Sequence, residues 1–303
     1  MDPLVSIIVA TFNRPDTVNE TLASCYAQDY GNIEVILYRD GGCHIEPIRD
    51  PRMKYISCDQ NHGAAYANNR AIEASNGEYI CYVGDDDIYY PNHVSALLKA
   101  IGNGQVAYSD LYKRYYRMIY GKRYPLAKNV EISRDFNRDM MWHFNHVLGM
   151  SLMHHRSTLE KTGMYNETLN VLIDYDMTRR LCFYYDFIHT RTITGEFFAE
   201  EDDGGDRISV RGRRSPQNYI RNLSTILHTR PPKPWVVPDL SIECGNDKLY
   251  AELHEAIWYP HDRNNPEAEF VLEATGRVNP FAVVHAIGDG GKIIENGVVY
   301  KRS

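Results

Sequence analysis

Three consecutive carboxylates, Asp85, Asp86 and Asp87, stand at the end of an apolar run that begins at Tyr79. In this run, aromatic or β-branched residues alternate with small apolar ones, which predicts a buried strand. Neighbouring carboxylates repel one another unless a cation lies among them, and a divalent metal is the simplest such cation. The alternative is a solvated turn before a helix over residues 91–101, because acids are favoured just ahead of a helix.

The elements that would position these acids follow a repeating pattern. Near-continuous apolar runs predict strands that are covered on both faces, and each is followed by a helical pattern. Strands are expected at 4–11, 33–38, 53–56 and 79–84, and helices from Pro15 onward and over 64–75. Strands that alternate with helices indicate an α/β fold with a mainly parallel central sheet and flanking helices.

Polar residues follow the ends of several of these strands. Thr11, Asn13 and Arg14 come after the first strand, and Asp40 ends the second, just before two glycines. Because ligands of such sheets bind beyond the carboxyl ends of the strands, we expect these residues and the three acids to meet in one cleft. Taken singly, each could instead end a strand, form a turn or cap a helix.

Composition limits the class of protein. The chain has 303 residues, of which 43% are hydrophobic, enough for one α/β domain of about 200–250 residues plus an appendage. Lys and Arg total 33 against 40 for Asp and Glu, and the net charge of −7 argues against a nucleic-acid partner, which requires a broad basic face.

Cysteine usage and hydropathy indicate a cytoplasmic protein. The six cysteines include no CxxC pair, and several lie in apolar patterns typical of reduced core cysteines. No apolar run approaches the roughly 18–20 residues that span a bilayer, and no signal segment precedes the first strand. Peripheral contact with the inner membrane surface stays open.

Four segments in order, VSIIVATFNRP, EVILYRDGG, NHGAAYANNRAIEASNGEYICYVGDDDIYYP and LIDYDMTRRL, resemble the family 2 glycosyltransferases of the GT-A fold. The segment YVGDDDIYYPNHV is similar to the metal-site segment of the bacterial spore-coat polysaccharide type. The resemblance covers about residues 3–195. It implies the GT-A nucleotide-diphospho-sugar transferase fold for this part of the chain.

The resemblance also implies roles for individual residues. Thr11 and Asp40 would contact the nucleotide base, and Asp85 the ribose. The nucleoside and diphosphate would be lined by Asn13, Arg14, Asn61, Gly63, Asn68 and Arg70. Asp86 and Asp87 would bind Mn²⁺ or Mg²⁺, which suits carboxylate oxygens and neutralises a diphosphate leaving group.

Asp174 matches the position of the family's catalytic base. By itself it is more simply a carboxylate that caps a helix, because it stands at the expected helix start. An inverting transfer needs a carboxylate that removes the proton of the attacking acceptor hydroxyl, which the resemblance assigns to Asp174. Asp176 is the next candidate.

Two positions depart from the commonest family pattern. Gly84 stands where that pattern has an aspartate, and Asn68 stands where an arginine is usual, with Arg70 two residues later. The metal-binding frame is therefore either Gly84 to Asp86 or Asp85 to Asp87. Asp86 belongs to both frames and is the preferred direct ligand.

The expected function is metal-dependent, inverting transfer of a sugar, from a UDP-sugar by resemblance, to a hydroxyl of a glycan or lipid-linked acceptor in bacterial polysaccharide synthesis. One alternative is a catalytically silent protein that binds a nucleotide sugar or acts as a scaffold. The other is a nucleotidyltransferase, which is disfavoured because no glycine-rich, basic phosphate loop follows the first strand.

The remaining segments suggest a division into domains. We expect a nucleotide-sugar half over 1–104, an acceptor half over 105–230, and a small α+β appendage over 231–303 that could mediate homo-oligomerisation. Expected local features are a hairpin over 105–124 turning near Gly121, a capping box from Ser157 to Glu160 and a proline linker at 231–234. A helix is expected over 247–257 and a hairpin turn at Asn296 and Gly297. The charged segment over 200–214 is either a disordered loop or a lid that closes over donor and acceptor. The histidines at 143, 146, 154 and 155 have no compact metal-ligand spacing.

Overall fold

The computed structural model describes residues 2–120, 122–131, 133–143, 145–200, 216–229 and 231–232, and four short strands between residues 257 and 301. The chain divides into two compact units. The first contains residues 1–136 and 146–205, and the second contains residues 137–145 and 206–303. Helix α8 (Pro216–His228), which was not predicted, belongs to the second unit.

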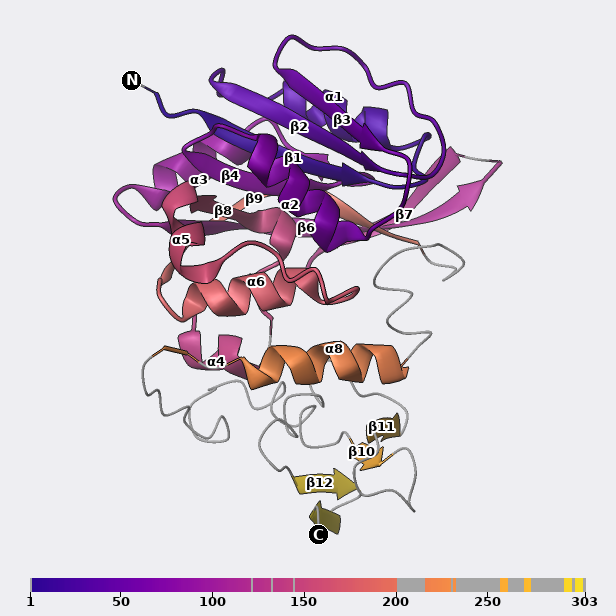
Figure 1. Cartoon of the computed structure of the whole chain (residues 1–303), viewed down its shortest axis with the longest axis vertical. Coiled ribbons are helices and arrows are strands. Elements are labelled where there is room, and N and C mark those ends of the chain that lie inside the picture. The colour runs from indigo at the N-terminus through magenta and orange to yellow at the C-terminus, as the bar shows by residue number, and fades with distance from the viewer. Residues whose placement is uncertain are drawn as a thin grey trace. The chain divides into compact units, whose positions relative to one another are not determined.

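The first unit is built on a nine-stranded sheet (Figure 1). Its strand order is β3-β2-β1-β4-β8-β6-β9-β5, and β7 pairs with β6. The strands are β1 (Val5–Thr11), β2 (Ile33–Asp40), β3 (Met53–Cys58), β4 (Tyr79–Gly84), β5 (Ile88–Tyr89), β6 (Val106–Ile119), β7 (Lys122–Val130), β8 (Leu152–His155) and β9 (Phe187–Glu200). The first four strands of this order are parallel, as the alternating pattern predicted.

Helices cover the sheet on both faces. They are α1 (Val18–Tyr26), α2 (Ala64–Ala74) and α3 (His93–Ile101), at the positions that the sequence predicted. Helix α3 contacts β6 and β9. Successive residues Ile7, Ile8 and Val9 of β1 are all fully buried, which explains its continuous apolar run. Ile7 and Val9 pack in one core cluster with α1 and α3, whereas α2 packs on β1 and β2.

The other half of the sheet is mixed. Strands β6 and β7 form the expected antiparallel hairpin, from Tyr112 opposite Val130 to Ile119 opposite Lys122. The turn residue Gly121 lies outside the described residues. Strand β9 runs parallel to β6 with two register shifts, and β5 pairs with its centre.

Short helices join the strands of this half. They are η1 (Gly149–Ser151), η2 (Arg156–Thr158), α5 (Leu159–Thr162) and α6 (Ile173–Cys182). The expected capping box at Ser157 is wrong, because α5 begins after Thr158 without a side-chain cap. The His155 ring instead accepts a hydrogen bond from the Ser157 N–H group at 3.2 Å, which draws Ser157 into η2.

The second unit contains α4 (Arg138–His143), α8 and two antiparallel strand pairs. Strand β10 (Ile257–Pro260) pairs with β11 (Phe270–Glu273), and β12 (Lys292–Glu295) pairs with β13 (Val298–Lys301). The second pair confirms the hairpin expected around Asn296 and Gly297. The expected lid beyond Glu200, its arginines at 207, 211, 213 and 214, Pro234 and most of the helix over 247–257 lie outside the described residues.

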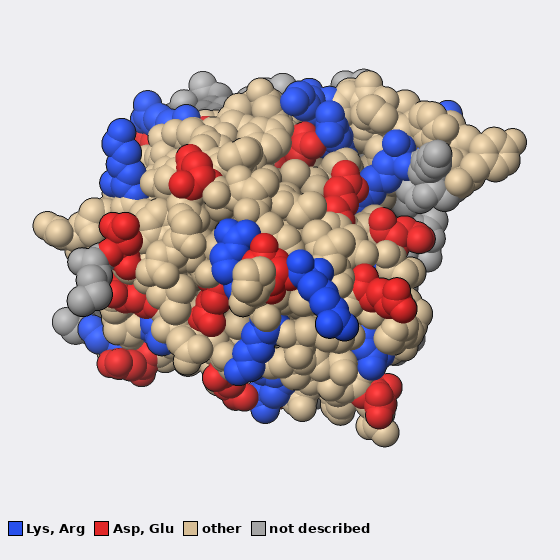
Figure 2. Space-filling model, turned by 90° about the horizontal axis from the view of Figure 1, so that it is seen from above, with Lys and Arg blue, Asp and Glu red and all other residues tan. Residues whose placement is uncertain are grey.

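The described surface carries charged side chains of both signs (Figure 2). On the face shown in Figure 2, basic and acidic side chains are interspersed among the described residues rather than gathered in a continuous basic area. In the described part of the chain, no helix combines the length and the apolar character needed to cross a bilayer. Cys25, Cys81 and Cys182 are buried, as predicted for core cysteines.

Candidate active site

The candidate site lies at the carboxyl ends of the parallel strands. Strands β1 and β4 are in register up to Ala10 and Gly84, so the loops after them begin side by side. The Phe12 N–H group donates a hydrogen bond to Asp85 Oδ2 at 3.2 Å, and the Thr17 hydroxyl donates to the Asp85 carbonyl at 2.9 Å. The structure therefore brings the loop after the first strand onto the acidic segment.

The ionisation of Asp85 is strongly affected by its surroundings. Burial first, and then the neighbouring charge of Asp86, raise the pKa of Asp85 to about 7. Thr11, Arg14 and the Phe12 N–H group oppose this rise in pKa. A cation beside these carboxylates would favour the ionised form, because opposite charge offsets the cost of desolvation.

Asp87 is anchored to the other half of the sheet. Its Oδ1 accepts a hydrogen bond from the Phe198 N–H group of β9 at 3.0 Å, and its carbonyl accepts one from the Thr21 hydroxyl at 2.8 Å. A Cβ atom at Gly84 would lie 2.5 Å from Asp87 Oδ2. The glycine at this position thus lets the acidic turn fold tightly.

These three carboxylates offer only oxygen donors, the type of ligand that Mg²⁺ and Mn²⁺ prefer. The raised pKa of Asp85, caused first by burial and then by the charge of Asp86, indicates that a nearby cation would stabilise its ionised form. Asp86, with Asp85 or Asp87, would hold such a cation, and the Phe198 N–H group of β9 positions Asp87.

Asp40 lies at the neighbouring strand end and is 2% exposed. Its Oδ2 accepts hydrogen bonds from the N–H groups of His62 at 3.0 Å and Gly63 at 2.7 Å, just ahead of α2. Gly63 has a φ of 99°, which favours glycine. Asp40 therefore joins the end of β2 to the N-terminus of α2, where backbone N–H groups favour negative charge.

Asn13 links the loops after β1 and β2. Its φ of 55° is left-handed, and its Oδ1 accepts a hydrogen bond from the Cys43 N–H group at 2.8 Å. A Cβ atom at Gly42 would lie 2.3 Å from the same oxygen. Asn13 thus shapes the strand-end loops, while the partly buried Arg14 acts on Asp85 through its charge.

The predicted nucleotide-binding residues on and just before α2 differ in exposure and in hydrogen-bond partners. Asn61 is exposed just before the helix. Asn68 donates a hydrogen bond to the Ala64 carbonyl at 2.9 Å, and Arg70 pairs with Glu73 at 2.6 Å and Glu167 at 3.4 Å. Asn68 and Arg70 therefore have partners within the chain.

Asn69, between them, was missed by the sequence analysis. It is 3% exposed, and its side chain both donates to the Tyr165 carbonyl and accepts from the Tyr165 N–H group, each at 2.9 Å. It therefore attaches α2 to the loop before α6. The available signal was an asparagine on the otherwise apolar face of a predicted helix.

Asp174 is the second residue of α6 and is partly buried. The N-cap of this helix is Leu172, with a left-handed φ of 58°, so the interpretation of Asp174 as the helix cap is wrong. Gly149 faces Asp174, since a Cβ atom there would lie 3.0 Å from Asp174 Cβ. The charge of Asp174 also contributes, after burial, to the raised pKa of Tyr165.

Asp176 has a different environment on the same helix. Its side chain is 2% exposed and pairs with Arg180 at 2.6 Å. Arg180 also donates hydrogen bonds to the carbonyls of Thr162 and Met164. This pairing attaches α6 to the loop that precedes it.

Comparisons with known proteins identify the family. Residues 6–157 match the model described as glycosyl transferase family 2, and the chain belongs to this family. Its fold is the GT-A fold. A crystal structure of S. aureus TarS 1-349 in complex with UDP-GlcNAc has a TM-score of 0.56 at 16% identity, over 74% of this chain and 65% of that chain.

Two further proteins are similar to parts of the chain. The mannosyltransferase PcManGT from Pyrobaculum calidifontis, in complex with GDP-Man and Mn²⁺, has a TM-score of 0.54 at 15% identity over 77% of this chain and 66% of that chain. The Escherichia coli UDP-Glc:alpha-D-GlcNAc-diphosphoundecaprenol beta-1,3-glucosyltransferase WfaP is 34% identical over 118 residues, which are 37% of this chain and 46% of that enzyme.

Proposed function

We propose that this protein is a metal-dependent, inverting glycosyltransferase that moves a sugar from a UDP-sugar to a hydroxyl of a glycan or lipid-linked acceptor. The observation that carries the proposal is the acidic segment after β4, which the Phe12 N–H group joins to the loop after β1. Family membership and the UDP-Glc and diphosphoundecaprenol named for WfaP support the substrate classes. A lipid-linked acceptor would bring the reaction to the inner membrane surface.

Each residue at the strand ends has a proposed role toward the donor. Asp86, with Asp85 or Asp87, holds Mg²⁺ or Mn²⁺, which supplies positive charge to the diphosphate leaving group. Asp85 also faces the ribose, and Thr11 and Asp40 contact the base. The proposed nucleoside and diphosphate contacts are Asn13, Arg14, Asn61, Gly63, Asn68 and Arg70.

Asp174 is the proposed base. Its carboxylate accepts the proton of the acceptor hydroxyl while the hydroxyl oxygen attacks the anomeric carbon. The bond to the diphosphate breaks on the opposite face of the sugar, which inverts the anomeric configuration. The position of Asp174 near the start of α6, where helix N–H groups favour a negative charge, supports an ionised carboxylate there.

A thermal-shift experiment with UDP tests the donor site. We expect UDP to stabilise the protein only with Mn²⁺ or Mg²⁺, by roughly 2.7 kcal/mol at 100 times its dissociation constant. Asp86→Asn should abolish this metal-dependent shift, whereas the exposed carboxylate control Asp59→Asn should retain it. An equal shift in EDTA contradicts the metal bridge, and sugar transfer to an acceptor separates an enzyme from a silent binding protein.

A further inference from the structure

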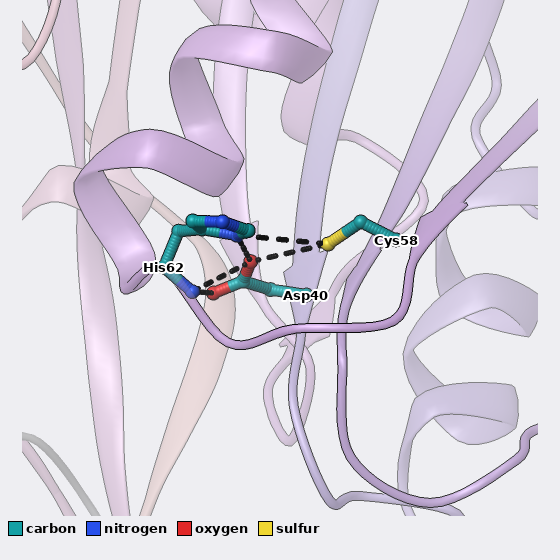
Figure 3. A group of neighbouring side chains, drawn as sticks. All are labelled: Asp40, Cys58 and His62. Atoms are coloured by element: carbon teal, nitrogen blue, oxygen red, sulfur yellow. Dashed lines mark hydrogen bonds and ion pairs between the residues drawn. The ribbon is translucent and has the colours of Figure 1, made fainter.

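A cysteine, a histidine and an aspartate come together beside the strand-end loops (Figure 3). Asp40 ends β2, Cys58 ends the neighbouring strand β3, and His62 lies just before α2. Their sulfur, nitrogen and oxygen atoms all lie within 4.8 Å of one another. These three side chains form the mixed cluster, which differs from the all-carboxylate segment after β4 in the chemistry of its donor atoms.

The backbone holds the mixed cluster together. Asp40 and Cys58 are opposite each other in the parallel pairing of β2 and β3. Both oxygens of Asp40 accept hydrogen bonds from the His62 N–H group, at 3.0 and 3.1 Å. The His62 ring stacks on Tyr66 of α2, with 4.5 Å between ring centroids. The donor atoms are therefore positioned by a strand pair and a helix start rather than by chance contact of long side chains.

The distances match those of a tetrahedral zinc site. Zinc lies about 2.3 Å from thiolate sulfur and about 2.0–2.2 Å from histidine nitrogen or carboxylate oxygen, so tetrahedral ligands are separated by roughly 3.4–3.6 Å. Here Cys58 Sγ lies 3.5 Å from Asp40 Oδ1 and 3.9 Å from His62 Nδ1. His62 Nδ1 lies 3.6 Å from Asp40 Oδ1. A shift of a few tenths of an ångström would bring all three separations into the range of a tetrahedral zinc site.

We propose that Asp40, Cys58 and His62 form a Zn²⁺ site with a fourth position for water. On binding, the Cys58 thiol, which now donates a hydrogen bond to the Gln60 carbonyl at 3.0 Å, releases its proton to solvent, and the thiolate binds the metal. Neutral His62 contributes Nδ1. The His62 and Gly63 N–H groups donate hydrogen bonds to Asp40 Oδ2 and so fix the orientation of the carboxylate. Hydrogen bonds to ligand side chains orient metal ligands in the same way in known metal sites.

The mixed cluster selects a different metal from the acidic segment. Thiolate and imidazole favour Zn²⁺, whereas Mg²⁺ prefers oxygen ligands. Asp40 is also proposed above to contact the nucleotide base, so under that proposed function bound Zn²⁺ and the donor would compete for Asp40. The zinc site itself is tested without nucleotide, and its failure is therefore distinguishable from failure of the proposed function.

Calorimetric titration of the full chain with Zn²⁺, in excess Mg²⁺ to occupy oxygen-only sites, tests the proposal. We expect Cys58→Ser and His62→Gln each to weaken one zinc site by at least about tenfold, because loss of a direct ligand exceeds the effect of losing an outer partner. Cys43→Ser, which removes an exposed cysteine outside the mixed cluster, should bind Zn²⁺ as wild type does. Unchanged zinc binding by folded Cys58→Ser overturns the proposal.

Co²⁺ absorption gives a second readout that does not depend on a variant that folds. Wild type and Cys43→Ser should show the thiolate-to-cobalt charge-transfer band of a tetrahedral site, and the band should be lost in Cys58→Ser. A wild-type spectrum without this band would also overturn the proposal, because Co²⁺ would then have no thiolate ligand.

Discussion

The two halves of the sheet use polar residues in opposite ways. In the parallel half, the carboxylates of Asp40 and Asp85 stand at strand ends and accept hydrogen bonds from backbone N–H groups in the loops after neighbouring strands. In the mixed half, polar side chains lie inside the layers and pair with one another, as His93 does with Thr194 at 2.7 Å. Carboxylates at the strand ends are therefore placed where a ligand can bind, whereas polar groups in the interior stabilise the fold.

This contrast predicts two kinds of variant. Changes at the candidate site should alter turnover and leave the free energy of unfolding nearly unchanged. Changes in the interior networks should lower stability and leave the activity of the folded fraction intact. Helix α6 carries one residue of each kind, Asp174 and Asp176, and so offers a matched pair.

Asp174→Asn should produce the largest effect. It keeps the shape of the side chain but removes the proposed base, so turnover should fall by roughly 10² to 10⁴-fold. Donor affinity should stay near wild type, because this group acts on the acceptor hydroxyl. Transfer rates and UDP calorimetry measure both quantities. Turnover above about a tenth of wild type would place the base elsewhere.

Asp176→Asn should act on stability instead. It leaves the mostly buried Arg180 without its carboxylate partner, and breaking a buried pair by removing one member costs about 3–5 kcal/mol. Urea denaturation measures this loss, and Asp174→Asn is the control on the same helix. A stable Asp176→Asn protein that binds donor but transfers no sugar would contradict the contrast between the two residues.

His154 predicts a smaller, pH-dependent effect. It is fully buried against Tyr82 and Thr158, and burial lowers its pKa to about 4. Between pH 6.5, its value in the unfolded chain, and about 4, the unfolded state binds more protons, so stability falls as pH falls. The slope from this group approaches about 1.4 kcal/mol per pH unit.

His154→Gln is the variant for this test, with urea denaturation at several values between pH 7 and pH 5. The slope of stability against pH should become shallower by up to one proton, while His93, whose pKa burial lowers to about 3, keeps a slope of the same sign. An unchanged slope would show that His154 is not held neutral in the folded protein.

Local sequence patterns were sufficient to predict the strands and helices of the parallel half of the sheet. The apolar runs and helical spacing predicted β1 to β4, α1 and α2, and the rule that ligands bind beyond strand ends predicted which loops meet there. What they did not predict are contacts between distant segments. Asp87 meets the Phe198 N–H group 111 residues away, and Asn69 meets Tyr165 96 residues away.

The capping box at Ser157 and the helix cap at Asp174 failed for a related reason. Both predictions rest on short sequence patterns, and residues outside each pattern determine where the helix begins. The His155 ring displaced the first, and the left-handed Leu172 moved the start of α6 away from the second. Tertiary packing decides between local alternatives that differ by only about 1 kcal/mol.

Gly84 couples two positions of the acidic turn. A Cβ atom there would lie 2.5 Å from Asp87 Oδ2, and the other oxygen of Asp87 accepts a hydrogen bond from the Phe198 N–H group of β9. A larger residue at position 84 therefore has to displace the Asp87 carboxylate and weaken its link to β9. Tolerance of substitution at position 84 thus depends on the residue at position 87.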